Sequence, residues 1–130
     1  MGIYKLGNNY YELVLEERNK MRTVENRSYV YEDALYIDLE DVNSTDTENR
    51  RGIDGSLIFL ERIDTGAMSA ADLVDKYVKE LIDRFIFRGT PEYNSKQVVP
   101  DGLEKEIRDF LEPRILKVYG ETAEKVTGDN

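Results

Sequence analysis

The most regular hydrophobic pattern lies between residues 69 and 88 and predicts an amphipathic helix. Its apolar side chains recur in two adjacent helical rows: Leu73, Tyr77, Leu81 and Phe85 in one row, and Val74, Val78, Ile82 and Ile86 in the other. Such a stripe is typical of a helix that packs on a sheet. We expect Ser69 to cap the helix, because its oxygen can accept a hydrogen bond from the first turn, and Gly89 to end it.

Two segments before that helix follow the period of a β-strand. Between residues 29 and 42, one face carries Tyr29, Tyr31, Leu35, Ile37 and Leu39, and the other carries Glu32, Tyr36, Asp38 and Glu40. This alternation predicts one buried side and one solvated side. Residues 56–63 predict a second strand, covered on both faces because residues 57–60 are all apolar. Joined by the polar loop 43–55, the two strands predict an antiparallel hairpin with a long exposed tip.

The segment from residue 9 to residue 25 supports two alternatives. Asn9 followed by Glu12 resembles a helix start with its capping partner, and residues 16–25 are rich in helix formers. Tyr11, Leu13 and Leu15 instead alternate as in a strand. The composition of residues 16–25 favours the helix slightly.

The C-terminal part predicts a second helix that begins after Asp101, which is expected to cap it with Glu104 as partner. Its apolar stripe contains Leu103, Ile107, Phe110 and Leu111, followed by Ile115, Leu116, Val118 and Tyr119. Pro113 is expected to kink or restart this helix, because proline lacks the backbone N–H. The chain therefore predicts one α+β domain over residues 1–120. In that domain an antiparallel sheet with a long acidic hairpin is packed by an amphipathic helix and a kinked C-terminal helix. Residues 121–130 form a polar tail.

Composition removes several kinds of chemistry. The 130 residues include neither cysteine nor histidine. Disulfides, zinc–thiolate sites and catalysis by Ser-His-Asp or Cys-His groups are therefore excluded within the chain. We expect no enzymatic activity and no cofactor. A magnesium site is the strongest catalytic alternative, with Asp38, Glu40, Asp41 and Glu61 as its candidate ligands. It is disfavoured because Asp38 and Glu40 lie on the predicted solvated face.

The net charge of −9 at pH 7 bears on partners and location. An acidic protein does not favour direct binding to nucleic acid or to anionic membranes, but it can bind a basic protein surface. No apolar segment is long enough to cross a membrane. Residues 1–6 lack the apolar core of a signal peptide, so we expect an intracellular protein.

Two sets of residues are candidates for binding other proteins. Residues 32–54 contain eight acids and two bases, a local charge of −6. The candidate partner-binding acids are Asp38, Glu40, Asp41, Asp46, Glu48 and Asp54; the alternative is that they only keep a polar loop soluble. The candidate interface aromatics are Tyr10, Tyr11, Tyr29, Tyr31 and Tyr36. Tyrosine is enriched at interfaces, but it is also a good strand former, so both interpretations stand.

Residues 35–87 follow the order strand, polar loop, strand, turn and helix, framed by the segments Leu35–Val42 and Leu57–Arg62. This order resembles the central unit of tail-terminator and neck proteins of tailed bacteriophages. The resemblance implies a non-enzymatic subunit that self-associates into a ring, in a virion or in the host cytoplasm. The alternative hypothesis is a small acidic inhibitor or nucleic-acid mimic, of the anti-defence type, that blocks a basic surface on a partner protein.

Overall fold

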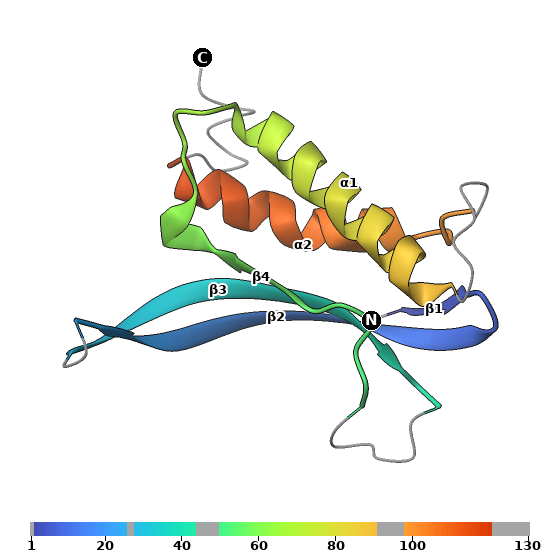
Figure 1. Cartoon of the computed structure of the whole chain (residues 1–130). Helices are drawn as coiled ribbons and strands as arrows, with labels where there is room; N and C mark the ends of the chain where they lie inside the picture. Colours follow the sequence, from blue (N-terminus) through green and yellow to red (C-terminus); the bar gives the residue numbers. More distant parts are fainter. Residues whose placement is uncertain (1, 26–27, 44–49, 91–97, 121–130) are drawn as a thin grey trace.

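The fold is an antiparallel four-stranded sheet followed by two helices. The computed structural model describes residues 2–25, 28–43, 50–90 and 98–120. In chain order its elements are β1 (Ile3–Leu6), β2 (Asn9–Val24), β3 (Ser28–Asp41), β4 (Ser56–Phe59), the 3₁₀ turn η1 (Leu60–Arg62), α1 (Ala70–Gly89) and α2 (Leu103–Val118). The strands pair with their sequence neighbours, in the order β1-β2-β3-β4 (Figure 1). The predicted α+β class is confirmed.

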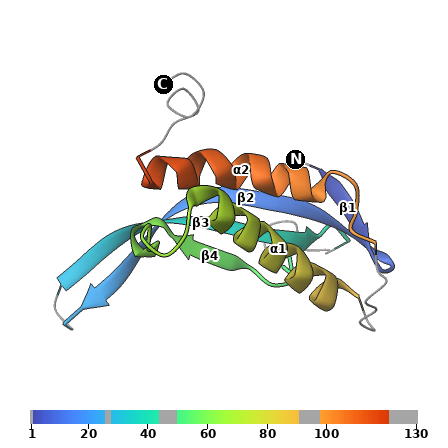
Figure 2. The ribbon, with the colours of Figure 1, turned by 90° about the horizontal axis from the view of Figure 1, so that it is seen from above.

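Both helices lie on the same face of the sheet, and the core fills the space between the two layers (Figures 1 and 2). The side chains that are fully buried there include Leu6, Leu13, Leu35, Ile37 and Leu39 from the sheet, and Phe85, Leu103, Ile107, Leu111 and Ile115 from the helices. The apolar rows predicted for α1 are confirmed, since all their members are buried except the partly buried Tyr77. None of the described helices is both long and apolar enough to cross a membrane.

The two helices begin in different ways. Ser69 caps α1 as predicted, because its Oγ accepts a hydrogen bond of 3.1 Å from the N–H of Asp72. The prediction that Asp101 caps α2 is wrong. The cap residue is Gly102, which has a φ of 87° and provides no side-chain hydrogen bond. A left-handed φ of this kind favours glycine. Pro113 lies inside α2, which continues to Val118 without restarting.

The helix favoured for residues 9–25 is wrong, because the segment forms strand β2. β2 pairs with β3 along its whole length, from Tyr11 opposite Asp41 to Val24 opposite Ser28. These cross-strand contacts outweigh the helix-forming composition of residues 16–25, as tertiary context commonly does. The N-terminal half keeps the alternation seen in the sequence, with the side chains of Tyr11 and Leu13 in the core.

β3 and β4 form the antiparallel pair that was predicted, and residues 44–49 of the predicted loop 43–55 lie outside the described residues. The second strand is shorter than expected, because it ends at Phe59 and η1 follows. The prediction that both faces of this strand are covered is also wrong. Ile58 is buried by the helices, whereas Leu57 on the opposite face is 39% exposed.

Candidate protein-interaction surface

The distal part of the β2–β3 ribbon, residues 18–24 and 28–33, extends beyond the rest of the molecule, and we call it the arm (Figure 1). β1 pairs only with residues 9–12 of β2, and β4 pairs only with residues 34–37 of β3. Within the described part of the chain, the arm is therefore a ribbon of two strands. Two-stranded ribbons are marginally stable alone in water, because one ladder must hold both strands.

One face of the arm carries large apolar side chains that solvent can reach. Met21 lies opposite Tyr31, and Thr23 lies opposite Tyr29, so these four side chains share a face of the ribbon. We call these residues the arm face. Met21 is 55% exposed, Tyr29 65% and Tyr31 61%. Neighbouring exposed side chains of this kind are typical of protein-interaction sites, where aromatic residues and methionine are enriched.

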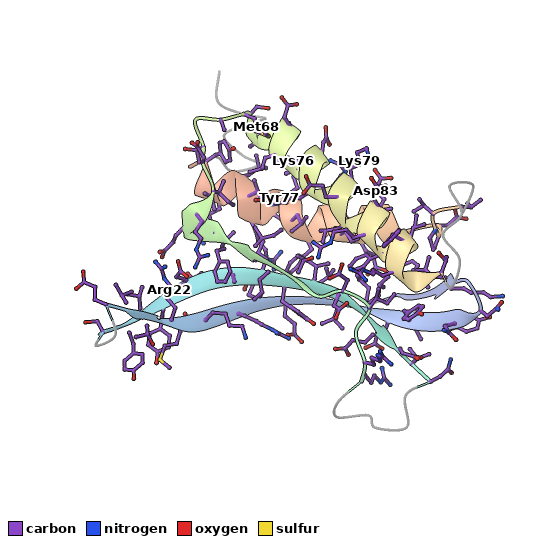
Figure 3. All side chains as sticks on the ribbon, in the orientation of Figure 1. Arg22, Met68, Lys76, Tyr77, Lys79 and Asp83 are labelled. Carbon is purple, nitrogen blue, oxygen red and sulfur yellow. The ribbon has the colours of Figure 1, made fainter. Side chains whose placement is uncertain are left out.

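The opposite side of the arm is fixed to the body through Glu32. Its carboxylate is buried and accepts hydrogen bonds of 2.6 and 3.1 Å from the guanidinium of Arg62, which follows β4 in η1. The Nε atom of Arg22 lies 3.2 Å from the same carboxylate (Figure 3). The hydrogen bond from Arg62, above all, lowers the pKa of Glu32 below its usual value. Arg62 also stacks on the ring of Phe59, 4.0 Å from its centroid.

Asp38 is not available to a partner, although it was predicted on a solvated face. It is 2% exposed. Ile37 pairs with Ser56, and the carbonyl of Leu39 accepts the N–H of Ile53, so Asp38 lies opposite two residues, 54 and 55, as in a β-bulge. Its Oδ1 accepts the N–H groups of Leu39 at 2.7 Å and of residue 54 at 3.1 Å. Its Oδ2 accepts the hydroxyl of Tyr36 at 2.8 Å.

The other predicted acids are dispersed rather than gathered on one projecting surface. Asp54 is paired with Arg84 of α1 at 2.9 Å and lies 3.9 Å from Arg88. Glu40 and Asp41 are half-buried at the end of β3. Burial, followed by repulsion from Asp38, raises the pKa of Glu40. The remaining two acids, Asp46 and Glu48, lie outside the described residues.

The five candidate tyrosines separate into two groups. Tyr10, Tyr29 and Tyr31 are exposed, and two of these belong to the arm face. Tyr11 is buried in the core. Tyr36 is half-buried. Burial and its hydrogen bond to Asp38 raise its pKa to about 12, and the guanidinium of Arg18 stacks 3.6 Å from its ring centroid.

A groove of about 450 Å³ lies between the base of the arm and the end of α2. Its charged lining residues are Glu17, Arg18, Asp33, Arg114 and Lys117. Both signs of charge are present, and Arg114 is already held by Glu17 at 2.8 Å. No group of three or more Asp or Glu residues within the described ranges is placed to hold a metal ion. The structure therefore does not assemble the magnesium site considered from the sequence.

The sequence did not identify Met21 and Thr23 as members of the arm face, and it did not identify the contact of Glu32 with Arg62. Assigning residues 9–25 to a helix removed Met21 from the strand face that it shares with Tyr31. The partner of Glu32, Arg62, lies 30 residues away in the sequence, so no local pattern connects the two. Comparisons with protein-family models, curated proteins and solved structures find no match to this chain.

Proposed function

We propose that this protein is a non-enzymatic protein-interaction subunit that self-associates through its arm. The observation that carries the proposal is the arm face, where Met21, Tyr29 and Tyr31 are each more than half exposed on a two-stranded ribbon. Burying these side chains against a partner would remove apolar surface from water and would add contacts to a ribbon that is marginal alone.

The distribution of charge supports self-association through this part of the molecule. Residues 18–33 contain four bases and three acids, a net charge of +1, whereas the whole chain carries −9. The remainder of the chain therefore carries −10. Because like charges repel, two copies approach each other most favourably through the part that is not acidic.

The resemblance to tail-terminator and neck proteins of tailed bacteriophages supports the same class of function. β3, β4 and α1 follow one another in the order on which that resemblance rests, over residues 35–87. A ring of subunits is the assembly that the resemblance implies. The alternative of an acidic inhibitor has less support, because Asp38 is buried and Asp54 is paired with Arg84.

The test is the native mass of the protein by light scattering over a wide concentration range, with negative-stain images of the same sample. We expect a defined oligomer or ring. The double variant Met21→Ser with Tyr31→Ser should weaken association by about tenfold or more, since aromatic residues at interface centres contribute about 2 kcal/mol or more. Val30→Ser, on the opposite face of the same strand, is the matched control. A wild-type protein that stays monomeric throughout contradicts the proposal, as does unchanged association of the double variant.

A further inference from the structure

We propose that β2 pairs with β2 of a second copy, edge to edge and antiparallel, so that the two sheets join into one. This inference rests on the proposed function, to which it adds a backbone contact along β2, the strand that carries Met21 of the arm face. Pairing of this kind is a two-fold arrangement, in which the same residues of both copies contribute to the interface.

Among the residues that the structure describes, the outer edge of β2 is open over most of its length. β1 pairs with β2 only as far as Glu12, and the last contact on that side is a hydrogen bond of 3.2 Å from the N–H of Leu13 to the carbonyl of Gly2. β2 continues to Val24. Among the described residues, no other strand lies beside this edge from residue 14 onward. An open edge offers unpaired backbone groups to another strand.

The direction of the backbone groups along this edge follows from two hydrogen bonds. The N–H of Leu13 points toward β1, whereas the carbonyl of Tyr10 accepts the N–H of Val42 from the β3 side. In an antiparallel strand, alternate residues direct both of their backbone groups to the same side. Residues 15, 17, 19, 21 and 23 therefore direct their N–H and C=O groups away from β3, where a second strand can pair with them.

The charges along β2 favour a second copy in antiparallel orientation. Glu16, Lys20 and Arg22 share one face of the strand, with the acid nearer the body and the bases nearer the tip. An antiparallel alignment about the middle of the open edge brings Glu16 of each copy close to Lys20 and Arg22 of the other. Arg18, which lies between them, is paired with Glu16 at 2.8 Å and stacked on Tyr36. This alignment also places Arg18 beside Lys20 of the other copy, but a parallel alignment in register would place every charge, Glu16 included, beside its own counterpart.

The contact also suits the shape and charge of the molecule. The arm is a two-stranded ribbon, and edge pairing would make it four-stranded, which is the regime in which a sheet becomes stable. The arm projects from the body (Figure 1), so antiparallel pairing along β2 would keep the two acidic bodies apart. Met21, which is 55% exposed on β2, would lie beside the new partner strand. A larger ring would need a second contact in addition to this one.

A charge-swap experiment tests the inference. One variant carries Glu16→Lys, and the other carries Lys20→Glu with Arg22→Glu. Each variant alone places like charges across the proposed contact, so its self-association should weaken by about tenfold or more. In an equimolar mixture residue 16 of each copy again faces residues 20 and 22 of opposite charge in the other copy, so heterodimers should form with an affinity near that of the wild type. Native mass spectrometry and light scattering distinguish the three samples.

The matched control for the doubly substituted variant is Lys76→Glu with Lys79→Glu on α1, which changes the net charge as Lys20→Glu with Arg22→Glu does, but away from the sheet (Figure 3). It should associate like the wild type. A second variant, Asn19→Pro, removes one outward N–H and leaves the ladder with β3 intact, so its self-association should weaken as well. If the charge variants do not fold, Asn19→Pro still tests whether β2 pairs with β2 of a second copy.

The outcomes separate the inference from the proposed function. If the wild-type protein self-associates and the swapped mixture recovers association lost by both variants, the edge contact is established. If the wild type associates but the charge variants or Asn19→Pro associate equally well, the inference is overturned and the proposed function stands. If the wild type is monomeric at all concentrations, both are overturned.

Discussion

The strand pattern predicts that the side chain of Asp38 faces solvent. In the structure its carboxylate is buried and accepts hydrogen bonds within the protein. The alternation of β3 places it on the face away from the helices. Asp38 lies opposite two residues, 54 and 55, in a β-bulge. Its carboxylate accepts hydrogen bonds from the backbone N–H groups of Leu39 and of residue 54 at this bulge. Removing such a buried acceptor leaves donors unpaired, at a cost of about 1–3 kcal/mol. Asp38 therefore stabilises the bulge.

Gly52 should not tolerate even a methyl group, because the buried carboxylate of Asp38 lies directly beside it. A Cβ atom at this position would lie 1.8 Å from Oδ2 of Asp38, which cannot move away without losing its hydrogen bond from Tyr36. We expect Gly52→Ala to lower the free energy of unfolding by about 1–3 kcal/mol, as overpacking does. Gly66→Ala is the matched control, since its nearest neighbour would be Asp64 Oδ1 at 3.4 Å. Urea denaturation compares the two, and equal stabilities would contradict this account.

At the scale of elements, the sequence predicted those whose side-chain pattern is long and self-consistent. The two apolar rows and the Ser69 cap of α1 extend over five turns of one period, so no tertiary information was needed. β2 was assigned wrongly because its second half, in which Met21 and Val24 are the only apolar residues, shows no apolar alternation. In that half the strand is specified by pairing with β3, a long-range contact that local composition does not encode.

The candidate surface was predicted only in part, for a related reason. The strand period of residues 29–42 correctly placed Tyr29 and Tyr31 on one face, but it also placed that face in the core. Leu35 and Ile37 are buried by the helices, whereas the tyrosines further along the same strand lie beyond the helices and are exposed. Where a covering layer ends depends on how the elements pack together. Periodicity alone does not reveal it.

The contact of Glu32 with Arg62, which we call the arm anchor, should depend on pH in a defined direction. The pKa of Glu32 is lower in the folded protein than in the unfolded chain, mainly because Arg62 donates hydrogen bonds to it. Its stabilising effect is therefore complete above the unfolded value of about 4.3 and is lost as the pH falls through the folded value. We expect Glu32→Gln to accelerate amide exchange in the arm several-fold at pH 7, and the difference from wild type to shrink in acid.

The exposed neighbour Glu61 supplies the control for the arm anchor. Glu61→Gln changes the same charge next to Arg62 without removing the buried carboxylate, so amide exchange in the arm should remain close to that of the wild type. Hydrogen exchange followed by mass spectrometry measures both variants at each pH. A difference between Glu32→Gln and wild type that grows in acid would show that Glu32 does not anchor the arm in this way.

On the scale of the whole molecule, polar contacts join the layers around the core. Arg108 of α2 pairs with Asp75 of α1 at 2.8 Å. Glu106 of α2 accepts hydrogen bonds from the N–H of Gly2 and from the hydroxyl of Tyr4 in β1. Arg114 of α2 reaches Glu17 of β2. Because both helices contact the same sheet and each other, we expect the body to unfold as one cooperative unit.

Two phenylalanines of α1 provide a direct test of that cooperativity. Phe85 is fully buried between the helices and the sheet, whereas Phe87, two residues later, is 54% exposed. Phe85→Ala should therefore lower the free energy of unfolding by about 3–5 kcal/mol, because it leaves a cavity at the centre of the core. Phe87→Ala should change it by about 0.5 kcal/mol.

Far-ultraviolet circular dichroism follows the backbone, and tyrosine fluorescence follows side chains that lie mainly in the strands. In Phe85→Ala the two transitions should move together, since a single core connects the layers; a shift in only one would mean that helices and sheet are stabilised separately.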